Sequence, residues 1–333
     1  MKSKVLIIAE VGSVHDGSFG NAQKLIEVAA NCGADIIKFQ THIAEAETLR
    51  DAPMPSYFQG EPRYEYFERT SFSLDQWRIL KEKCDEYHIE FMSAPFSIEA
   101  VELLKKVSVK RYKIGSGEVT NLPLLKVIAE TSKPVLLSSG MSSWSELDDA
   151  VSTIQKVHND ITVLQCTSEY PCSYENVGLN IMVEMKERYK LPVGLSDHTM
   201  TNYTAFAAVT LGASVIEKHL TFSRDMYGSD AKHSLLPDEF ADLVDGIRAI
   251  DTALSSKVDK DLLAEKFSDM KDIFQKSIVS VVDIPKGALI TREMIGFKKP
   301  GTGISAGYSN AVIGKTSNTN ISINSLIRLE DLI

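Results

Sequence analysis

Cysteine is scarce in this chain, with four residues among 333, and no two of them form a Cys-x-x-Cys pair. We therefore expect free thiols in a reducing cytoplasm rather than a disulfide framework or a zinc ribbon. Long apolar runs are also missing. No stretch approaches the roughly 18 residues of a membrane span, and the run Val5–Ala9 is too short for a signal peptide. These absences predict a cytoplasmic protein without a membrane partner.

Basic residues are fewer than acidic residues as well. The 36 Lys and Arg residues stand against 45 Asp and Glu residues, which gives a net charge of −9. Because a basic surface field is what attracts nucleic acids, a nucleic-acid partner is not expected. The Gly-x-Gly-x-x-Gly fingerprint of dinucleotide-binding folds is absent too. Any anionic small substrate must be met by individual lysines or helix N-termini.

Hydrophobic residues recur in eight short runs that do not alternate with polar residues, which is typical of strands buried on both faces. The runs are Val5–Ala9, Ile36–Phe39, Ile89–Ser93, Arg111–Ile114, Val135–Ser138, Thr162–Gln165, Val193–Leu195 and Val215–Glu217. Helical patterns separate them, with start signals such as the capping box Ser143-Trp-Ser-Glu146. The pattern predicts an α/β fold, a (β/α)₈ TIM barrel; a doubly wound open sheet is the alternative.

The connection from Thr41 to Phe72 is too long for a simple loop between a strand and a helix. Two interpretations stay open: the segment shapes or covers the barrel mouth, or its aromatic side chains form a local packing cluster. The apolar side chains in question are Met54, Tyr57, Phe58, Tyr64, Tyr66 and Phe67.

The pattern changes after Leu254, where charged helical sequence replaces the repeating units. We expect a catalytic barrel over residues 1–254, a linker over 255–276 and a β-rich domain over 277–333. A turn-rich domain of this size has little core of its own, so it should depend on packing against something else.

Two histidines, His198 and His219, follow successive strands. If these strands are neighbours in a parallel barrel, both imidazoles point into one mouth. Two neutral imidazoles make a site for a divalent metal such as Mn²⁺ or Mg²⁺, with water and substrate oxygens as further ligands. Asp197 and Glu217 are available to orient the rings. The alternative is a hydrogen-bonded histidine pair without a metal.

Polar side chains also end the other strands. Lys113 precedes Gly115-Ser116-Gly117, where glycine lets backbone N–H groups approach an anion closely. With Ser138 on the next strand, these residues predict a phosphate cradle. Lys38 is placed to hold a second anionic group such as a carboxylate. Glu118 is either a functional carboxylate or a residue that starts a helix.

Seven motifs stand at these strand ends: Ile8-Ala-Glu10-Val-Gly12, Lys38-Phe-Gln40-Thr41, Lys113-Ile-Gly-Ser-Gly-Glu118, Ser138-Ser-Gly-Met141, Cys166-Thr-Ser-Glu-Tyr-Pro171, Ser196-Asp-His198-Thr and Glu217-Lys-His219. In this order and spacing the chain resembles the sialic acid synthase family, which comprises N-acetylneuraminate synthase and its nonulosonic acid relatives. Lys299-Pro-Gly-Thr-Gly-Ile304 resembles the antifreeze-like (SAF) module of these enzymes. The resemblance covers the whole chain.

The resemblance implies a transferase that condenses phosphoenolpyruvate with water and an open-chain N-acetylated hexosamine, N-acetylmannosamine first, to give N-acetylneuraminate and phosphate. It implies a divalent metal at His198 and His219, Mn²⁺ first with Mg²⁺ or Co²⁺ as alternatives, and a domain-swapped homodimer. The matching positions are Glu118, Glu10 and Lys113 for catalysis; Lys38, Lys113, Ser116, Ser138 and Ser196 for phosphoenolpyruvate; and Glu10, Gln40, Tyr170, Asp230 and Lys299 of the partner subunit for the sugar.

Several departures from the family pattern fall on the sugar side, among them Ser168 for Asn and Lys299 for Arg. A legionaminic or pseudaminic acid synthase, which takes a 2,4-diacetamido hexose, is therefore an alternative. A phosphorylated acceptor would need a further basic residue in the mouth, and none stands out. A sugar-binding protein without catalysis would have lost functional residues at the strand ends, whereas Glu10, Glu118 and His219 are present.

Overall fold

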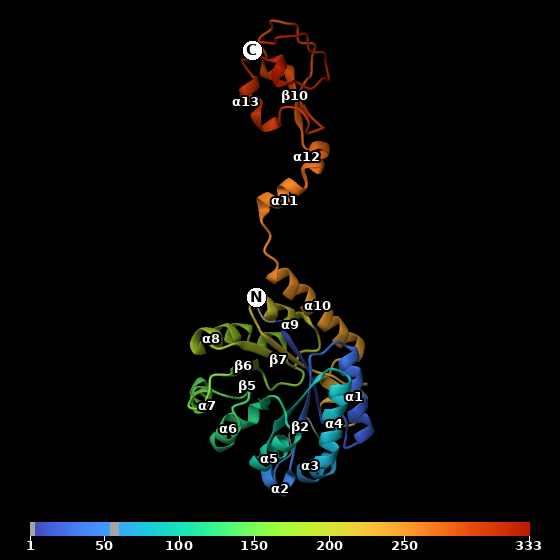
Figure 1. Cartoon of the computed structure of the whole chain (residues 1–333), viewed down its shortest axis with the longest axis vertical. Helices are drawn as coiled ribbons and strands as arrows, with labels where there is room; N and C mark the ends of the chain where they lie inside the picture. Colours follow the sequence, from blue (N-terminus) through green and yellow to red (C-terminus); the bar gives the residue numbers. More distant parts are fainter. Residues whose placement is uncertain (1–3, 54–59) are drawn as a thin grey trace. The chain divides into compact units, whose positions relative to one another are not determined.

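Eight parallel strands close into a barrel in the computed structural model, which describes residues 4–53 and 60–333 (Figure 1). The strands are β1 (Leu6–Gly12), β2 (Ile36–Thr41), β3 (Glu90–Pro95), β4 (Tyr112–Ile114), β5 (Val135–Ser138), β6 (Ile161–Cys166), β7 (Val193–Asp197) and β8 (Val215–His219). Strand β1 pairs with both β2 and β8, which closes the ring. The predicted TIM barrel is confirmed, and the open sheet is wrong.

One helix of the outer ring follows each strand. In order these are α1 (Phe19–Asn31), α4 (Leu74–Glu86), α5 (Ile98–Val107), α6 (Leu122–Ala129), α7 (Trp144–Gln155), α8 (Leu179–Tyr189), α9 (Tyr203–Thr210) and α10 (Pro237–Ser255). The capping box at Ser143 and Glu146 starts α7 as the sequence predicts. The main apolar core lies between these helices and the outward-facing strand residues.

A second, smaller apolar cluster fills the inside of the barrel. Its fully buried members come from six strands: Ile8, Ile36, Met92, Leu136, Leu164 and Val215. Since side chains alternate along a strand, the residue two positions further along points inward as well. In most of these strands, the residue two positions after the member of the apolar cluster is polar. A layer of polar side chains therefore lies above the cluster, nearer the carboxyl ends of the strands.

The long connection after β2 carries two short helices, α2 (Ala44–Glu47) and α3 (Arg63–Thr70). Tyr66 and Phe67 line the barrel mouth, whereas Tyr64 is buried under the Arg50 guanidinium, 4.2 Å from its ring centre. The two interpretations of this segment thus each hold for part of it. Met54, Tyr57 and Phe58 lie outside the described residues.

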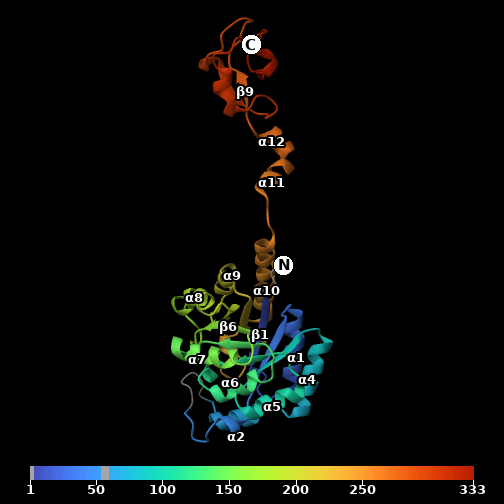
Figure 2. The ribbon, with the colours of Figure 1, turned by 60° about the vertical axis from the view of Figure 1, so that its left-hand side comes forward.

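Residues 257–333 form a separate compact unit. It contains α11 (Lys260–Lys266), α12 (Ser268–Phe274), β9 (Ser277–Ser280), β10 (Ile295–Lys298) and α13 (Ser309–Val312), labelled in part in Figures 1 and 2. Strands β9 and β10 are antiparallel, and isoleucines such as Ile278 and Ile327 make a small core. Among the described residues of the whole chain, no helix combines the length and the apolar character needed to cross a membrane.

Candidate active site

A cavity of about 330 Å³ opens at the carboxyl ends of the barrel strands. It collects every predicted catalytic, substrate-binding or metal-binding residue except Glu118 and Lys299. The predicted residues that line it are Glu10, Lys38, Gln40, Lys113, Ser116, Ser138, Tyr170, Ser196, His198, His219 and Asp230. They come from seven different strands or the loops after them, so only the closed barrel brings them together.

Two lysines and two carboxylates make the floor of this cavity, and all four side chains are buried. The Lys38 ammonium lies 2.8 Å from Glu10 Oε2 and 3.4 Å from Glu217 Oε1. The Lys113 ammonium lies 2.8 Å from the same Glu217 oxygen, which also accepts a hydrogen bond from Ser196 Oγ. The floor is therefore close to neutral, although it is built from four charges.

The side chains of the floor differ in how strongly their surroundings favour the charged form. Burial by itself would raise the pKa of Glu217, but Lys113 and Lys38 outweigh it and hold that pKa well below its usual range. Burial opposes the charged form of Lys38, yet Glu10 and Glu217 raise its pKa. For Lys113 burial dominates and lowers the pKa. Lys113 is thus the lysine of the floor that gives up a proton more readily.

The two histidines lie side by side at the mouth, because β7 and β8 are adjacent strands, and their ring centres are 5.4 Å apart. His198 Nδ1 lies 2.8 Å from the Thr167 carbonyl oxygen, which can only accept, so Nδ1 is the donor and Nε2 keeps its lone pair. Burial, with His219 nearby, lowers the pKa of His198 to about 3, which keeps the ring neutral.

A buried polar atom without a partner marks the other histidine: His219 Nδ1 makes no hydrogen bond. An imidazole nitrogen in that position is costly unless a ligand takes it up. The described residues contain no group of three His, Cys, Asp or Glu side chains that could hold a metal. The pair of histidines nevertheless fits a divalent ion, provided that water and substrate oxygens complete its coordination.

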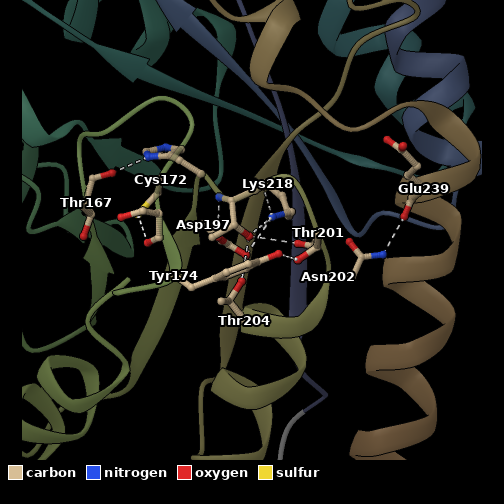
Figure 3. Close-up of polar contacts among 12 residues, drawn as sticks. Thr167, Cys172, Tyr174, Asp197, Thr201, Asn202, Thr204, Lys218 and Glu239 are labelled. Carbon is tan, nitrogen blue, oxygen red and sulfur yellow. Dashed lines mark hydrogen bonds and ion pairs between the residues drawn. The ribbon is translucent and has the colours of Figure 1, made fainter. Parts of the chain in front are cut away.

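A buried polar network lies on the other side of the same two strands (Figure 3). The Lys218 ammonium is 2.9 Å from Asp197 Oδ2, which also accepts a hydrogen bond from Thr204 Oγ1 at 2.6 Å. Lys218 further donates to the Thr199 carbonyl oxygen at 2.7 Å. This ion pair ties β7 to β8 directly beside both histidines. Breaking such a buried pair by removing one partner typically costs about 3–5 kcal/mol.

The expectation that Asp197 and Glu217 orient the imidazoles is not met by the contacts. Asp197 points away from the mouth toward Lys218, because it alternates along β7 with Ser196, which lines the cavity. Glu217 belongs to the lysine floor instead. His198 is fixed by backbone groups: its ring donates to the Thr167 carbonyl oxygen, and its own carbonyl oxygen accepts from the Cys172 amide at 2.9 Å.

Hydroxyl groups converge on the β4–β5 side of the cavity. A Cβ atom on Gly140 would lie 2.5 Å from Ser116 Oγ and 2.6 Å from Ser168 Oγ, so glycine is needed there for both hydroxyls to approach. Ser138 lines the same cavity. With Lys113 close by, these donors suit an anionic group. Ser168, which stands where some members of the resembled family carry Asn, belongs to this hydroxyl cluster.

The residues predicted to contact a sugar lie near the histidines. Gln40 Nε2 donates to Glu10 Oε1 at 2.8 Å, and Asp230 Oδ2 accepts from the Ser13 amide at 3.1 Å. Gly12, with φ of +46°, leaves room for this carboxylate, since a Cβ atom there would lie 2.2 Å from Asp230 Oδ2. The Tyr170 ring is centred 4.2 Å from that of His198.

Two predicted site residues are not among those lining the cavity. Glu118 ends a short 3₁₀ turn (Ser116–Glu118) next to the lining residue Gly117, and its carboxylate accepts from Asn121 Nδ2 at 2.8 Å. Burial raises the pKa of Glu118. Lys299 lies in the second unit, where its ammonium is 4.9 Å above the Phe274 ring.

The cavity also contains residues to which the sequence analysis gave no role. His42 stacks between Phe67 and Phe96, with ring centres 3.8 and 4.2 Å away, and it contacts Gln40 Oε1 through Nε2 at 3.1 Å. Arg63 reaches the cavity from α3. The sequence analysis gave Glu217 a role beside the histidines, not the one it has in the lysine floor, and nothing in the sequence indicated Arg63.

The closed barrel and the charged, hydroxyl-lined mouth define a TIM-barrel enzyme for small anionic substrates. Comparison with known families is more specific: the NeuB family matches residues 25–259, and the SAF domain matches residues 275–333. The chain belongs to the NeuB family. Enzymes of this family are metal-dependent transferases that condense phosphoenolpyruvate, so the chain is a phosphoenolpyruvate-dependent nonulosonic acid synthase.

Relatives of different substrate specificity resemble the chain to a similar degree. It is 38% identical to the N,N'-diacetyllegionaminic acid synthase of Campylobacter jejuni, over 98% of this chain and 99% of that one. It is 35% identical to human N-acetylneuraminate-9-phosphate synthase, over 88% and 82%. A crystal structure of N-acetylneuraminic acid synthetase from Leptospira borgpetersenii, in complex with citrate, aligns with a TM-score of 0.70, 31% identity, and coverage of 79% and 90%.

Proposed function

We propose that the chain condenses phosphoenolpyruvate with an open-chain hexose that carries acetamido groups, forming a nine-carbon 2-keto acid. The observation that carries the proposal is the histidine pair, with one unpartnered nitrogen, in the same cavity as the lysine floor and the hydroxyl cluster. A 2,4-diacetamido hexose is the first candidate acceptor, favoured by the 38% identity to the legionaminic acid synthase. N-acetylmannosamine is the second, favoured by the N-acetylneuraminic acid synthetase structure.

The charged floor and the hydroxyl cluster suit the donor substrate. In the proposal Lys38 and Lys113 face the carboxylate and phosphate of phosphoenolpyruvate, and the hydroxyls complete the phosphate contacts. The hydroxyls are those of Ser116, Ser138 and Ser196. Entry of the substrate requires both lysines to exchange carboxylate partners in part for substrate oxygens, which keeps the site satisfied before and after binding.

The acceptor would occupy the side of the mouth near the histidines. Glu10, Gln40, Tyr170 and Asp230 offer the alternating carboxylate, amide and hydroxyl groups that sugar hydroxyls require. The Lys299 ammonium of the partner subunit would reach the acyl group in a domain-swapped homodimer. The same proposal places the enzyme in the cytoplasm.

The residues of the chain position the reactants and move protons. C3 of phosphoenolpyruvate attacks the aldehyde carbon with the electron pair of its double bond, and water adds to the cationic C2 that results. The tetrahedral C2 then releases phosphate as its C–O bond breaks and the ketone forms. Glu118, whose pKa is raised by burial, is suited to transfer the protons that these steps require.

A divalent metal held by His198 and His219, Mn²⁺ first with Mg²⁺ or Co²⁺ as alternatives, would supply a Lewis acid that polarises the aldehyde carbonyl. We therefore expect phosphate release from phosphoenolpyruvate to need three components: the protein, the acceptor sugar and the metal. The check is a phosphate-release assay with the full-length chain after exhaustive chelation, with each component restored in turn. Release that continues at the same rate after chelation would rule out the metal's role.

A further inference from the structure

A guanidinium with one unpartnered nitrogen lies in the barrel mouth. Arg63, the first residue of α3, lines the cavity, and its Nε is buried without a hydrogen-bond partner. The centre of the guanidinium is 5.2 Å from the Phe67 ring centre. A buried donor that makes no hydrogen bond costs free energy unless a ligand satisfies it. Arg63 is therefore positioned to donate a hydrogen bond to an acceptor that comes from outside the chain.

A stack of rings holds this guanidinium in place. Phe67, which it covers, stacks on His42 with ring centres 3.8 Å apart, and His42 in turn stacks on Phe96 at 4.2 Å. His42 follows β2 and Phe96 follows β3. In the closed strand order β3 is four strands away from β7, the strand that His198 directly follows. Arg63 is thus anchored on the side of the mouth opposite that histidine.

Arg63 also differs in charge balance from the other cations of the cavity. Lys38 and Lys113 each have a carboxylate oxygen at 2.8 Å. Within residues 4–53 and 60–333, Arg63 has no ion pair. It is near enough to Glu118 to counteract part of the effect of burial on the pKa of that carboxyl group, but the two side chains form no hydrogen bond. Arg63 is thus the cation of this cavity whose charge is least compensated.

We propose that Arg63 is an oxyanion anchor, which binds a phosphoryl or carboxylate group of a substrate at the side of the mouth opposite His198. A guanidinium presents a planar fork of donors that matches the oxygens of such groups. The inference rests on the proposed function and deepens it. Two sources can supply the group: phosphoenolpyruvate, or a phosphate ester on the acceptor sugar. The second source would make the chain selective for a phosphorylated acceptor.

Binding to the full-length protein tests this anchor. Calorimetric titrations with phosphoenolpyruvate, N-acetylmannosamine and N-acetylmannosamine 6-phosphate would compare the unchanged chain with Arg63→Met and Arg63→Lys. Because hydrogen bonds to charged groups are strong, Arg63→Met should weaken binding of the ligand that carries the oxyanion by roughly 10- to 100-fold. Arg63→Lys keeps the charge but loses the fork, so its affinity should fall between the two. Arg78→Met, on the exposed face of α4, is the matched control and should change nothing.

The pattern of losses identifies the source. A loss confined to phosphoenolpyruvate assigns the anchor to the donor, and a loss confined to the 6-phosphate assigns it to the acceptor. Affinities within twofold of the unchanged chain for every ligand, in both folded Arg63 variants, would overturn the proposal. So would a lack of affinity of the unchanged chain for either phosphate compound. These titrations need no turnover, so they remain decisive even if no acceptor is condensed and the proposed function itself fails.

Discussion

Replacing His219 with alanine should reduce turnover by roughly 10³-fold or more, because a Lewis acid supplies several kcal/mol of transition-state stabilisation. The same change should abolish tight binding of Mn²⁺, measured by calorimetry or by the loss of the free-ion signal in electron paramagnetic resonance. The fold should persist, since His219 Nδ1 makes no hydrogen bond that the substitution would remove. The Asp197–Lys218 ion pair beside it also stays in place.

His158→Ala provides the matched control, because this histidine follows α7 and lies outside the cavity. It should leave both metal affinity and turnover unchanged. A His219→Ala protein that keeps near-normal turnover, or binds Mn²⁺ as tightly as before, would reject His219 as a ligand. Unfolding in urea, followed for all three proteins, separates a lost ligand from a lost fold.

Glu118→Gln should lower kcat by about 10²–10⁴-fold, the usual contribution of a positioned proton-transfer group.

The same substitution should not lower the stability of the folded protein at pH 8. Burial raises the pKa of this carboxyl group, so the folded protein disfavours its ionised form. The carboxyl's contribution to stability is therefore complete below the unfolded-state pKa and is lost as pH rises through the folded-state pKa. Glutamine cannot ionise, so at pH 8 the urea midpoint of Glu118→Gln should equal or exceed that of the unchanged protein.

Glu130→Gln is the control for this experiment, since Glu130 is an exposed carboxylate at the end of α6. It should affect neither kcat nor the urea midpoint. A kcat for Glu118→Gln within tenfold of the unchanged enzyme would remove Glu118 from the proton-transfer steps. A lower midpoint at pH 8 would contradict the sign of the pKa argument.

Most of the barrel could be predicted from the sequence, because successive side chains of a strand always point to opposite faces. Val215, Glu217 and His219 share one face of β8, so the position of His219 in the mouth follows from the apolar run before it. The same rule would have sent Asp197 and Lys218 to the outer face. The interpretation of Asp197 as a partner for a histidine overlooked that rule, and the structure pairs it with Lys218 instead.

Other features of the site depend on tertiary contacts that no local pattern encodes. Arg63 lies in a long connection without periodicity, beside the stack of His42 between Phe67 and Phe96. The shared carboxylate of Glu217 depends on Lys113, which is 104 residues away in the sequence. Closure of the barrel is what places such residues within hydrogen-bonding distance.

The proposed reaction joins phosphoenolpyruvate to an acetamido sugar. The most direct test incubates the full-length protein and Mn²⁺ with phosphoenolpyruvate and either a 2,4-diacetamido hexose or N-acetylmannosamine, and measures both phosphate and product mass. One phosphate should appear for each molecule of a product whose mass equals both substrates plus water minus phosphoric acid. Phosphate release that does not depend on the sugar, or the absence of such a product with both acceptors, would contradict the proposed reaction.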